Sequence, residues 1–175
     1  MSILLHTCCA PCLTYSYKEF KKAYDDVTPI WFNPNIHPFK EYEKRLESMK
    51  NFEEEIDTKI IFLDEYHLEG FLKEALEAEN RCEICYERRF LRTAKIAKEK
   101  KIPRFSTTLT ISPYQDHQLI KKVGKRVGRS KDVEFIYKDL RKGFSEHHNM
   151  ANKLNLYKQG YCGCIFSERD RYYKK

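Results

Sequence analysis

The chain has 175 residues, of which 41% are hydrophobic and 34% are charged, and its formal net charge is +7. This length and composition are typical of one soluble globular domain with a core of its own. No apolar stretch approaches the ~18 residues that a membrane-spanning helix requires, and the N-terminus lacks the features of a secretory signal. We therefore exclude an integral membrane protein and expect a cytoplasmic location.

The first strand that the sequence predicts ends at cysteines. Residues 3–6 form an apolar run of strand length, and Cys8 and Cys9 follow at once, with Cys12 three residues further on. Apolar residues at helical spacing then predict a helix over residues 13–23. The elements expected next are a strand at 27–32, a loop at 33–38, a helix at 40–55 and a strand at 59–63.

The second half of the chain continues the alternation of helices and strands. A helix is expected over residues 68–78, and a longer one follows Cys82 and Cys85 and extends to Lys100. The remaining predicted elements are a strand at 104–109, a helix at 115–123, a strand at 133–137, a helix at 145–156 and a charged tail after Phe166. This alternation is typical of a parallel sheet of about five strands with helices on both faces. Ligands bind such sheets at the carboxyl ends of the strands, where the first cysteines lie.

The seven cysteines indicate a metal or redox site. Their number is odd, and in a reducing cytosol such residues are more typical of metal binding or catalysis than of disulfides. They fall into short-spaced groups, which are Cys8 with Cys9 and Cys12, Cys82 with Cys85, and Cys162 with Cys164. A tetrahedral zinc site or an iron–sulfur cluster would each take four thiolates and leave three. Those three could hold a second metal or stay free for redox chemistry, so the residues alone leave the metal and the division open.

The basic and aromatic residues are compatible with a nucleic acid partner. Residues 121–131 are rich in lysine and arginine without interleaved acidic residues. The candidate phosphate contacts there are Lys121, Lys122, Lys125, Arg126 and Arg129. The 12 tyrosines and 11 phenylalanines could supply base stacking or simply an aromatic core. A phosphate-binding loop motif and a G-x-G-x-x-G fingerprint are both missing, which argues against a nucleotide cofactor.

Four motifs, taken in order, resemble one known family. They are His6-Thr7-Cys8-Cys9-Ala10-Pro11-Cys12, Cys82-Glu83-Ile84-Cys85-Tyr86-Glu87-Arg88-Arg89, Ser106-Thr107-Thr108-Leu109 with Ser112-Pro113-Tyr114, and Tyr161-Cys162-Gly163-Cys164. In this order the chain resembles the QueH-type epoxyqueuosine reductases, and the resemblance spans nearly its whole length. It implies a single catalytic domain over residues 1–175 with a Rossmann-like fold, related to the nucleotide alpha-hydrolase folds. The cysteine turn would stand where those relatives keep a phosphate loop.

The resemblance also implies the cofactors and the reaction. A [4Fe–4S] cluster and a second, mononuclear iron are expected, without cobalamin. The cluster would be bound by Cys8, Cys9, Cys82 and Cys85, while Cys12, Cys162 and Cys164 would bind or border the second iron. The reaction would be the two-electron removal of the epoxide oxygen from epoxyqueuosine at the wobble position of tRNA, the last step of queuosine biosynthesis, with an unidentified electron donor. The proton would come from His6, Tyr86 or Tyr114.

Alternatives from other classes remain open at this point. A zinc-stabilised RNA-binding module would use the same thiols without catalysis, and an iron–sulfur carrier or redox sensor would act on a protein partner. A tRNA sulfur-transfer enzyme of the related fold should need ATP, and the missing phosphate loop argues against it.

Overall fold

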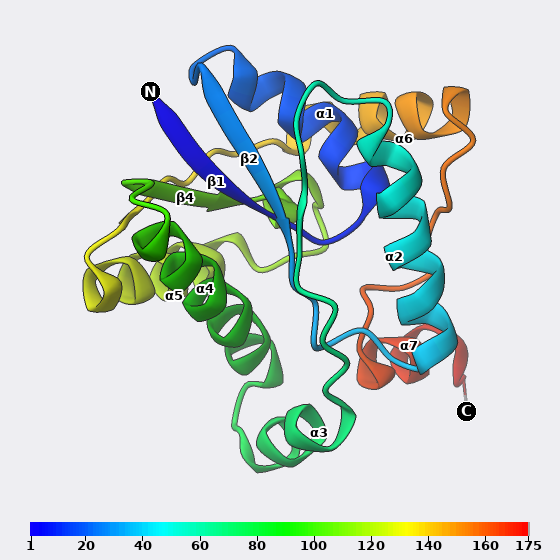
Figure 1. The fold of residues 1–175 in the computed structure, drawn as a ribbon. Helices are drawn as coiled ribbons and strands as arrows, with labels where there is room; N and C mark the ends of the chain where they lie inside the picture. Colours follow the sequence, from blue (N-terminus) through cyan, green and yellow to red (C-terminus); the bar gives the residue numbers. More distant parts are fainter. Residues whose placement is uncertain (175) are drawn as a thin grey trace.

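The computed structural model describes residues 1–174 and contains one parallel sheet of five strands (Figure 1). The strands are β1 (Ser2–Thr7), β2 (Asp26–Trp31), β3 (Ile61–Phe62), β4 (Arg104–Thr107) and β5 (Glu134–Phe135). Their order across the sheet is β3-β2-β1-β4-β5, and every pair is parallel. The chain therefore builds outward from β1 to one edge and then continues on the other side of β1. This order confirms the predicted fold class and places a topological switch point between β1 and β4.

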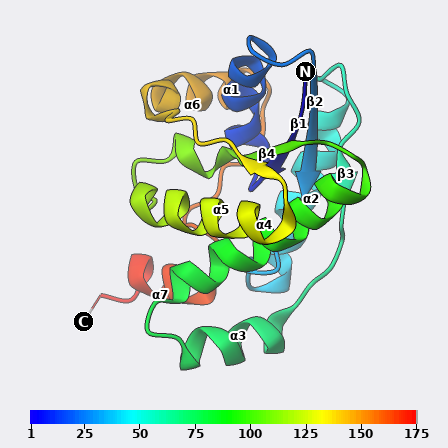
Figure 2. The same ribbon diagram turned by 90° about the vertical axis from the view of Figure 1, so that its left-hand side faces the viewer.

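Helices cover both faces of the sheet, as predicted. They are α1 (Ala10–Lys21), α2 (Phe39–Glu53), α3 (Leu68–Glu77), α4 (Arg81–Glu99), α5 (His117–Lys131), α6 (Phe144–Lys153) and α7 (Ile165–Tyr172), with short 3-10 helices at Thr108–Ile111 and Arg141–Gly143. Helices α1, α2 and α6 lie on one face and α4 and α5 on the other (Figure 2). Helices α3 and α7 lie beyond the carboxyl ends of the strands (Figure 1).

The alternation of side chains along β1 divides the core into two layers. Ile3 and Leu5 pack toward α1 and α2, where Phe20 and Met49 are fully buried. Leu4 packs on the other face, among the apolar residues of α4 and α5. Because β1 is buried on both faces, its sequence is a continuous apolar run rather than an alternating one.

Several predicted boundaries were wrong. The edge strands β3 and β5 pair over two residues each instead of the full stretches predicted, because each has a neighbour on one side only. The strand predicted to reach Leu109 ends at Thr107, whose hydroxyl accepts a hydrogen bond from the Leu109 amide at 3.2 Å and begins a 3-10 helix. The predicted charged tail contains α7, whose first turn is capped by the Cys164 sulfur.

Helix α5 is longer than predicted because packing overrides helix propensity. The prediction ended it at Val123, directly before Gly124, and a glycine in a helix interior costs about 1 kcal/mol relative to alanine. A Cβ atom built on Gly124 would lie 2.3 Å from the ring of Phe135, and one on Gly128 would lie 2.7 Å from the carbonyl oxygen of Val133. The two glycines therefore allow α5 to pack directly against β5, and the helix continues to Lys131.

The part of the chain that the structure describes has no helix that combines the length and the apolar character needed to cross a bilayer.

Candidate functional site

The site is built around the turn that follows β1 at the switch point. The backbone amide of Cys8 donates a hydrogen bond to Thr108 Oγ1 at 3.2 Å, immediately after the end of β4. Asn33, which follows β2, donates through Nδ2 to the carbonyl oxygen of Thr7 at 2.9 Å. Groups at the ends of three neighbouring strands therefore hold the turn in place, at the position where parallel sheets bind ligands.

Cys8, Cys9 and Cys12 converge at this turn. Their Sγ atoms all lie within 4.8 Å of one another. Cys9 caps the N-terminus of α1 in an extended conformation, and its sulfur accepts a hydrogen bond from the Cys12 amide at 3.4 Å. Hydrogen bonds from Cys12 and Cys9 lower the pKa of Cys8, and the interaction with Cys8 raises the pKa of Cys12. Negative charge therefore gathers on Cys8, next to the positive end of the α1 dipole.

The other four cysteines form a second group. The side chain of Asn80 caps α4 by accepting a hydrogen bond from the Cys82 amide at 3.0 Å, which places Cys82 and Cys85 in the first helical turns. Burial raises the pKa of Cys82, and Cys162 and Cys164 raise it further. Burial raises the pKa of Cys85 to about 12, and the same two cysteines add to the effect. The charges of these four thiols therefore act on one another, although they come from distant parts of the chain.

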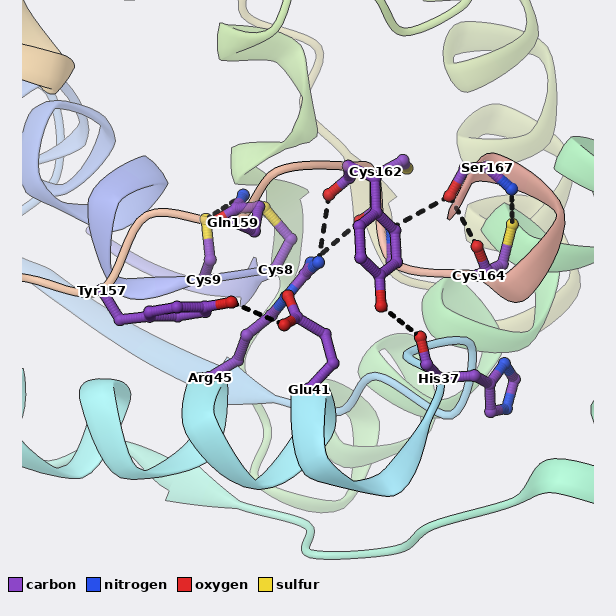
Figure 3. A network of polar contacts seen from close by, with 12 residues as sticks. Cys8, Cys9, His37, Glu41, Arg45, Tyr157, Gln159, Cys162, Cys164 and Ser167 are labelled. Atoms are coloured by element: carbon purple, nitrogen blue, oxygen red, sulfur yellow. Dashed lines mark hydrogen bonds and ion pairs between the residues drawn. The ribbon is translucent and has the colours of Figure 1, made fainter. Parts of the chain in front are cut away.

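Residues 157–164, here called the strap, carry Cys162 and Cys164 to the site. The strap runs past α2, from which Arg45 and Glu41 project toward it (Figure 3). Arg45 is 1% exposed and donates to the carbonyl oxygens of Cys162 at 2.9 Å and Tyr161 at 3.0 Å. Its Nε atom forms a buried ion pair with Glu41 Oε1 at 2.7 Å. A buried guanidinium on α2 thus fixes the backbone on both sides of the bond between Tyr161 and Cys162.

Further contacts tie the two ends of the strap to α2 and to the loop before it. Tyr157 donates its hydroxyl to Glu41 Oε2 at 2.6 Å, and Tyr161 donates its hydroxyl to the carbonyl oxygen of His37 at 2.5 Å (Figure 3). The His37 amide in turn donates to the carbonyl oxygen of Gly163 at 2.8 Å. Gly163 has a φ of +144°, which a residue with a side chain rarely adopts, so it provides the bend between the two cysteines.

Three nitrogen donors from different elements are directed at the cysteine sulfurs. Gln159 Nε2 on the strap lies 3.1 Å from Cys9 Sγ, and Gln115 Nε2, before α5, lies 3.3 Å from Cys162 Sγ. Arg89 Nη2 on α4 lies 3.0 Å from Cys85 Sγ. Because thiolates are stronger acceptors than thiols, this set of donors favours the ionised sulfurs that bind metals.

The three predicted proton donors differ in their surroundings. His6 is fully buried, its ring nitrogens lie 2.9 Å from Thr107 Oγ1 and 3.2 Å from the Phe32 carbonyl oxygen, and burial lowers its pKa to about 3. Tyr86 is 2% exposed and donates its hydroxyl to Gln115 Oε1 at 2.8 Å, while burial raises its pKa. Tyr114 is 85% exposed and directly precedes Gln115.

The predicted basic residues all lie on α5, with Arg126 near the second cysteine group. Arg126 forms ion pairs with Glu83 at 2.6 Å and Glu87 at 3.2 Å, both on α4 close to Cys82. Lys121 lies over the ring of Tyr137, with its Nζ atom 4.2 Å from the ring centroid. The exposed predicted contacts are Lys122, Lys125, Arg126 and Arg129.

Some residues of the site carried no signal in the sequence. Arg45 and Glu41 have the i,i+4 spacing of an ordinary helical ion pair, which gives no hint of the strap that they hold. Gln115 and Gln159 are isolated polar residues whose contacts with sulfur depend on the tertiary fold.

The fold and the site together define a Rossmann-like α/β protein with seven free thiols gathered at the carboxyl edge of its sheet. The profile of the family described as "Epoxyqueuosine reductase QueH" matches residues 3–170. The chain belongs to this family, which confirms the resemblance found in the sequence. Membership in a reductase family favours an oxidoreductase over an RNA-binding module or a redox carrier.

Curated relatives from several bacteria match nearly the whole chain. A protein named epoxyqueuosine reductase QueH from Dehalococcoides mccartyi is 38% identical and covers 98% of this chain and 95% of its own. The relatives of the same name from Staphylococcus epidermidis and Thermotoga maritima are 35% and 33% identical. They cover 94% and 97% of this chain and 75% and 92% of their own lengths, respectively.

A solved structure supports the fold assignment. The U34-tRNA thiolase NcsA from Methanococcus maripaludis, with its [4Fe–4S] cluster, superimposes with a TM-score of 0.61. The match covers 95% of this chain and 61% of the thiolase, at 19% sequence identity. At this identity the likeness establishes the shared fold alone.

Proposed function

We propose that residues 1–175 form one catalytic domain that reduces epoxyqueuosine to queuosine at the wobble position of tRNA. Two electrons and two protons convert the epoxide to an alkene and release its oxygen as water. The observation that carries the proposal is the convergence of Cys8, Cys9 and Cys12 at the switch point of a chain that has four further free thiols and belongs to the QueH family. An electron donor from outside the chain supplies the electrons.

The donor set fits an iron–sulfur cofactor. Cluster iron is held by cysteine thiolates, usually four, and the seven cysteines are all free of disulfide bonds. The grouping in the structure favours a different division from that expected from the sequence. We assign Cys82, Cys85, Cys162 and Cys164 to a [4Fe–4S] cluster, because Cys85 and Cys164 pack in one apolar cluster and each has a second cysteine close by in the chain. The group of Cys8, Cys9 and Cys12, whose sulfurs lie within 4.8 Å, would hold a second iron.

When bound, the cluster would supply single electrons and the second iron would act as a Lewis acid at the epoxide oxygen. The residues of the chain then have to deliver protons and exclude water. Tyr86 is suited to proton delivery, because its hydroxyl is buried beside Gln115, which contacts Cys162. Both nitrogens of His6 already have partners, so we assign it to holding the β1 turn against Thr107.

The tRNA would approach over the edge that carries Tyr114. Its exposed ring lies one residue from Gln115, and its edge contacts Phe144 at a ring-centroid distance of 5.9 Å. An exposed aromatic ring close to the cysteine site is suited to stacking on an unpaired base of the anticodon loop. The basic residues of α5 would contact the backbone phosphates, with Arg126 positioned next to the second cysteine group by Glu83.

The first experiment is anaerobic purification followed by iron and sulfide analysis and an activity assay. Tested with dithionite and tRNA that carries epoxyqueuosine, the protein should remove one oxygen atom, as seen by mass spectrometry of the nucleoside. Colourless protein that binds only zinc and leaves the nucleoside unchanged would refute the proposal.

Two cysteine variants test the division of the thiols. Cys82→Ser should lose the visible absorbance of the cluster together with activity. Cys12→Ser should keep the absorbance and lose iron beyond that of the cluster. The reverse pattern, in which Cys12→Ser removes the absorbance, would assign the cluster to the first group.

A further inference from the structure

Arg89 is a buried cation whose nearest acceptors belong to a cysteine. Its side chain is among the largest fully buried ones, at 1% exposure. Nη2 donates to Cys85 Sγ at 3.0 Å, and Nε donates to the Cys85 carbonyl oxygen at 3.1 Å. Within residues 1–174, Arg89 forms no ion pair with an aspartate or glutamate, although many of the other arginines and lysines do.

Arg45 shows what a buried arginine ordinarily requires in this protein. It is as deeply buried as Arg89, but its charge is compensated by the carboxylate of Glu41 at 2.7 Å. A buried charge without a counter-charge is strongly unfavourable, because it gives up hydration and receives nothing in exchange. Arg89 therefore needs an anion, and the groups around it that can become anionic are thiols and the hydroxyl of Tyr86, whose pKa is raised by burial.

The position of Arg89 relates it to the second cysteine group. Its Nη2 atom contacts Cys85 Sγ, and Cys85 packs with Cys164 of the strap in one apolar cluster. The guanidinium also lies over the ring of Tyr86, with its carbon atom 5.7 Å from the ring centroid. The positive charge is therefore fixed beside sulfurs that come from two distant parts of the chain.

We propose that Arg89 is the fixed counter-charge of the thiol site, which stabilises bound metal and sets the reduction potential of the cofactor. The part about the potential rests on the proposed iron–sulfur cluster, and the part about metal binding does not. A metal centre held by four thiolates is anionic, and it gains one more negative charge when it is reduced by one electron. A buried cation in contact with a ligand sulfur favours the more negative state, which raises the reduction potential.

Zinc affinity tests the proposal on the protein without its cluster. The variants are Arg89→Met, which removes the charge, and Arg89→Lys, which keeps it. The control is Arg92→Met on the same helix, where the lost charge is partly exposed and paired with Glu65 at 2.7 Å. In competition with a chromophoric chelator, Arg89→Met should bind Zn²⁺ about tenfold more weakly or worse. Arg89→Lys should recover most of this loss, and the control should match the wild type.

Stability of the reduced, metal-free protein separates a counter-charge from a packing residue. There the thiols are largely protonated and the charge of Arg89 is uncompensated, so Arg89→Met should be at least as stable as the wild type in urea. A packing residue would give the opposite result. If Arg89→Met is clearly destabilised or fails to fold without metal, the proposal is overturned.

The reduction potential completes the test on protein reconstituted with iron and sulfide. Arg89→Met should lower the potential by about 59 mV or more, which is a tenfold change in the equilibrium of a one-electron reduction. Arg92→Met should leave it unchanged. Equal potentials and equal zinc affinities in wild type and Arg89→Met would overturn the proposal. If the wild type takes up no cluster, the proposed function fails, while zinc affinity and metal-free stability still decide the role of Arg89.

Discussion

The ion pair between Arg45 and Glu41 should dominate the stability of the strap. Their side chains are 1% and 9% exposed, so replacing Arg45 with methionine would leave a buried carboxylate without a counter-charge, held only by the neutral hydroxyl of Tyr157. Removing one member of a buried pair costs about 3–5 kcal/mol. The carbonyl groups of Tyr161 and Cys162 would also lose their donors, but both residues are near the surface and can be hydrated. We therefore expect Arg45→Met to lose about 3–5 kcal/mol, a large part of a typical unfolding free energy.

Urea unfolding of the reduced, metal-free protein measures this loss. The double variant Arg45→Met with Glu41→Leu should lose less than Arg45→Met alone, because no charge is then left buried. Lys40→Met on the same helix is the control. Lys40 pairs with Glu43 at 2.9 Å, but its side chain is 79% exposed. Lys40→Met should therefore change the unfolding free energy by no more than about 0.5 kcal/mol.

If Arg45→Met lowers the unfolding free energy by less than about 1 kcal/mol, this expectation is refuted, because a buried carboxylate that has lost its counter-charge destabilises the fold by more than that. Additive effects in the double variant would equally show that the two residues do not depend on each other. The same variant carries a functional expectation. Because Arg45 holds the carbonyl of Cys162, Arg45→Met should take up less iron on reconstitution, whereas Lys40→Met should match the wild type.

Two further predictions concern packing and pH. Gly124→Ala should lower the unfolding free energy by about 1–2 kcal/mol, because the clash with the Phe135 ring outweighs the gain in helix propensity. Gly70→Ala should raise the unfolding free energy by up to about 1 kcal/mol, because the nearest atoms to the added methyl group lie 3.8 Å away. Thermal unfolding checks both, and shifts of the same sign would contradict the packing argument. Hydrogen bonds from Lys22 and Lys138 hold the pKa of Glu19 below its usual 4.5. The ionised Glu19 therefore stabilises the folded state fully above pH 4.5, and this stabilisation is lost as the pH falls through the lowered pKa. Between about pH 5 and pH 3, Glu19→Gln should therefore lose about 1 kcal/mol less unfolding free energy than the wild type. Urea unfolding across this pH range measures the difference, and an identical pH dependence in the two proteins would contradict the role of Glu19.

Local patterns in the sequence were sufficient for the centre of the sheet and the first cysteines. The run at residues 3–6 is apolar on both faces because β1 is covered on both faces, and the cysteines that follow must then lie at a strand end. The two short-spaced pairs were equally visible as ligand pairs. These features depend on residues close in the chain, so spacing alone reveals them.

The division of the thiols that we propose rests on contacts between distant residues, which the sequence does not reveal. Arg45 and Cys162 are 117 positions apart, and Gln159 and Cys9 are 150 positions apart. No spacing rule connects such residues, whereas the fold brings them within hydrogen-bond distance. The end of α5 has the same origin, since Gly124 appears unfavourable in the helix until Phe135 is seen packed against it.

The electrostatics of the switch point explain why this site suits an anionic centre. The N-terminus of α1 is capped by the sulfur of Cys9, so the positive end of the helix dipole is directed at the first thiol group. Helix N-termini at this position in related folds are suited to phosphate for the same reason. Here Arg89 adds a full positive charge without a carboxylate partner among residues 1–174, while the charge of Arg45 is already neutralised by Glu41. The excess positive charge is therefore located at the sulfurs, and it is balanced only when they ionise and bind metal. The switch point therefore favours a thiolate-bound metal centre, because the fold supplies its counter-charges before the metal arrives.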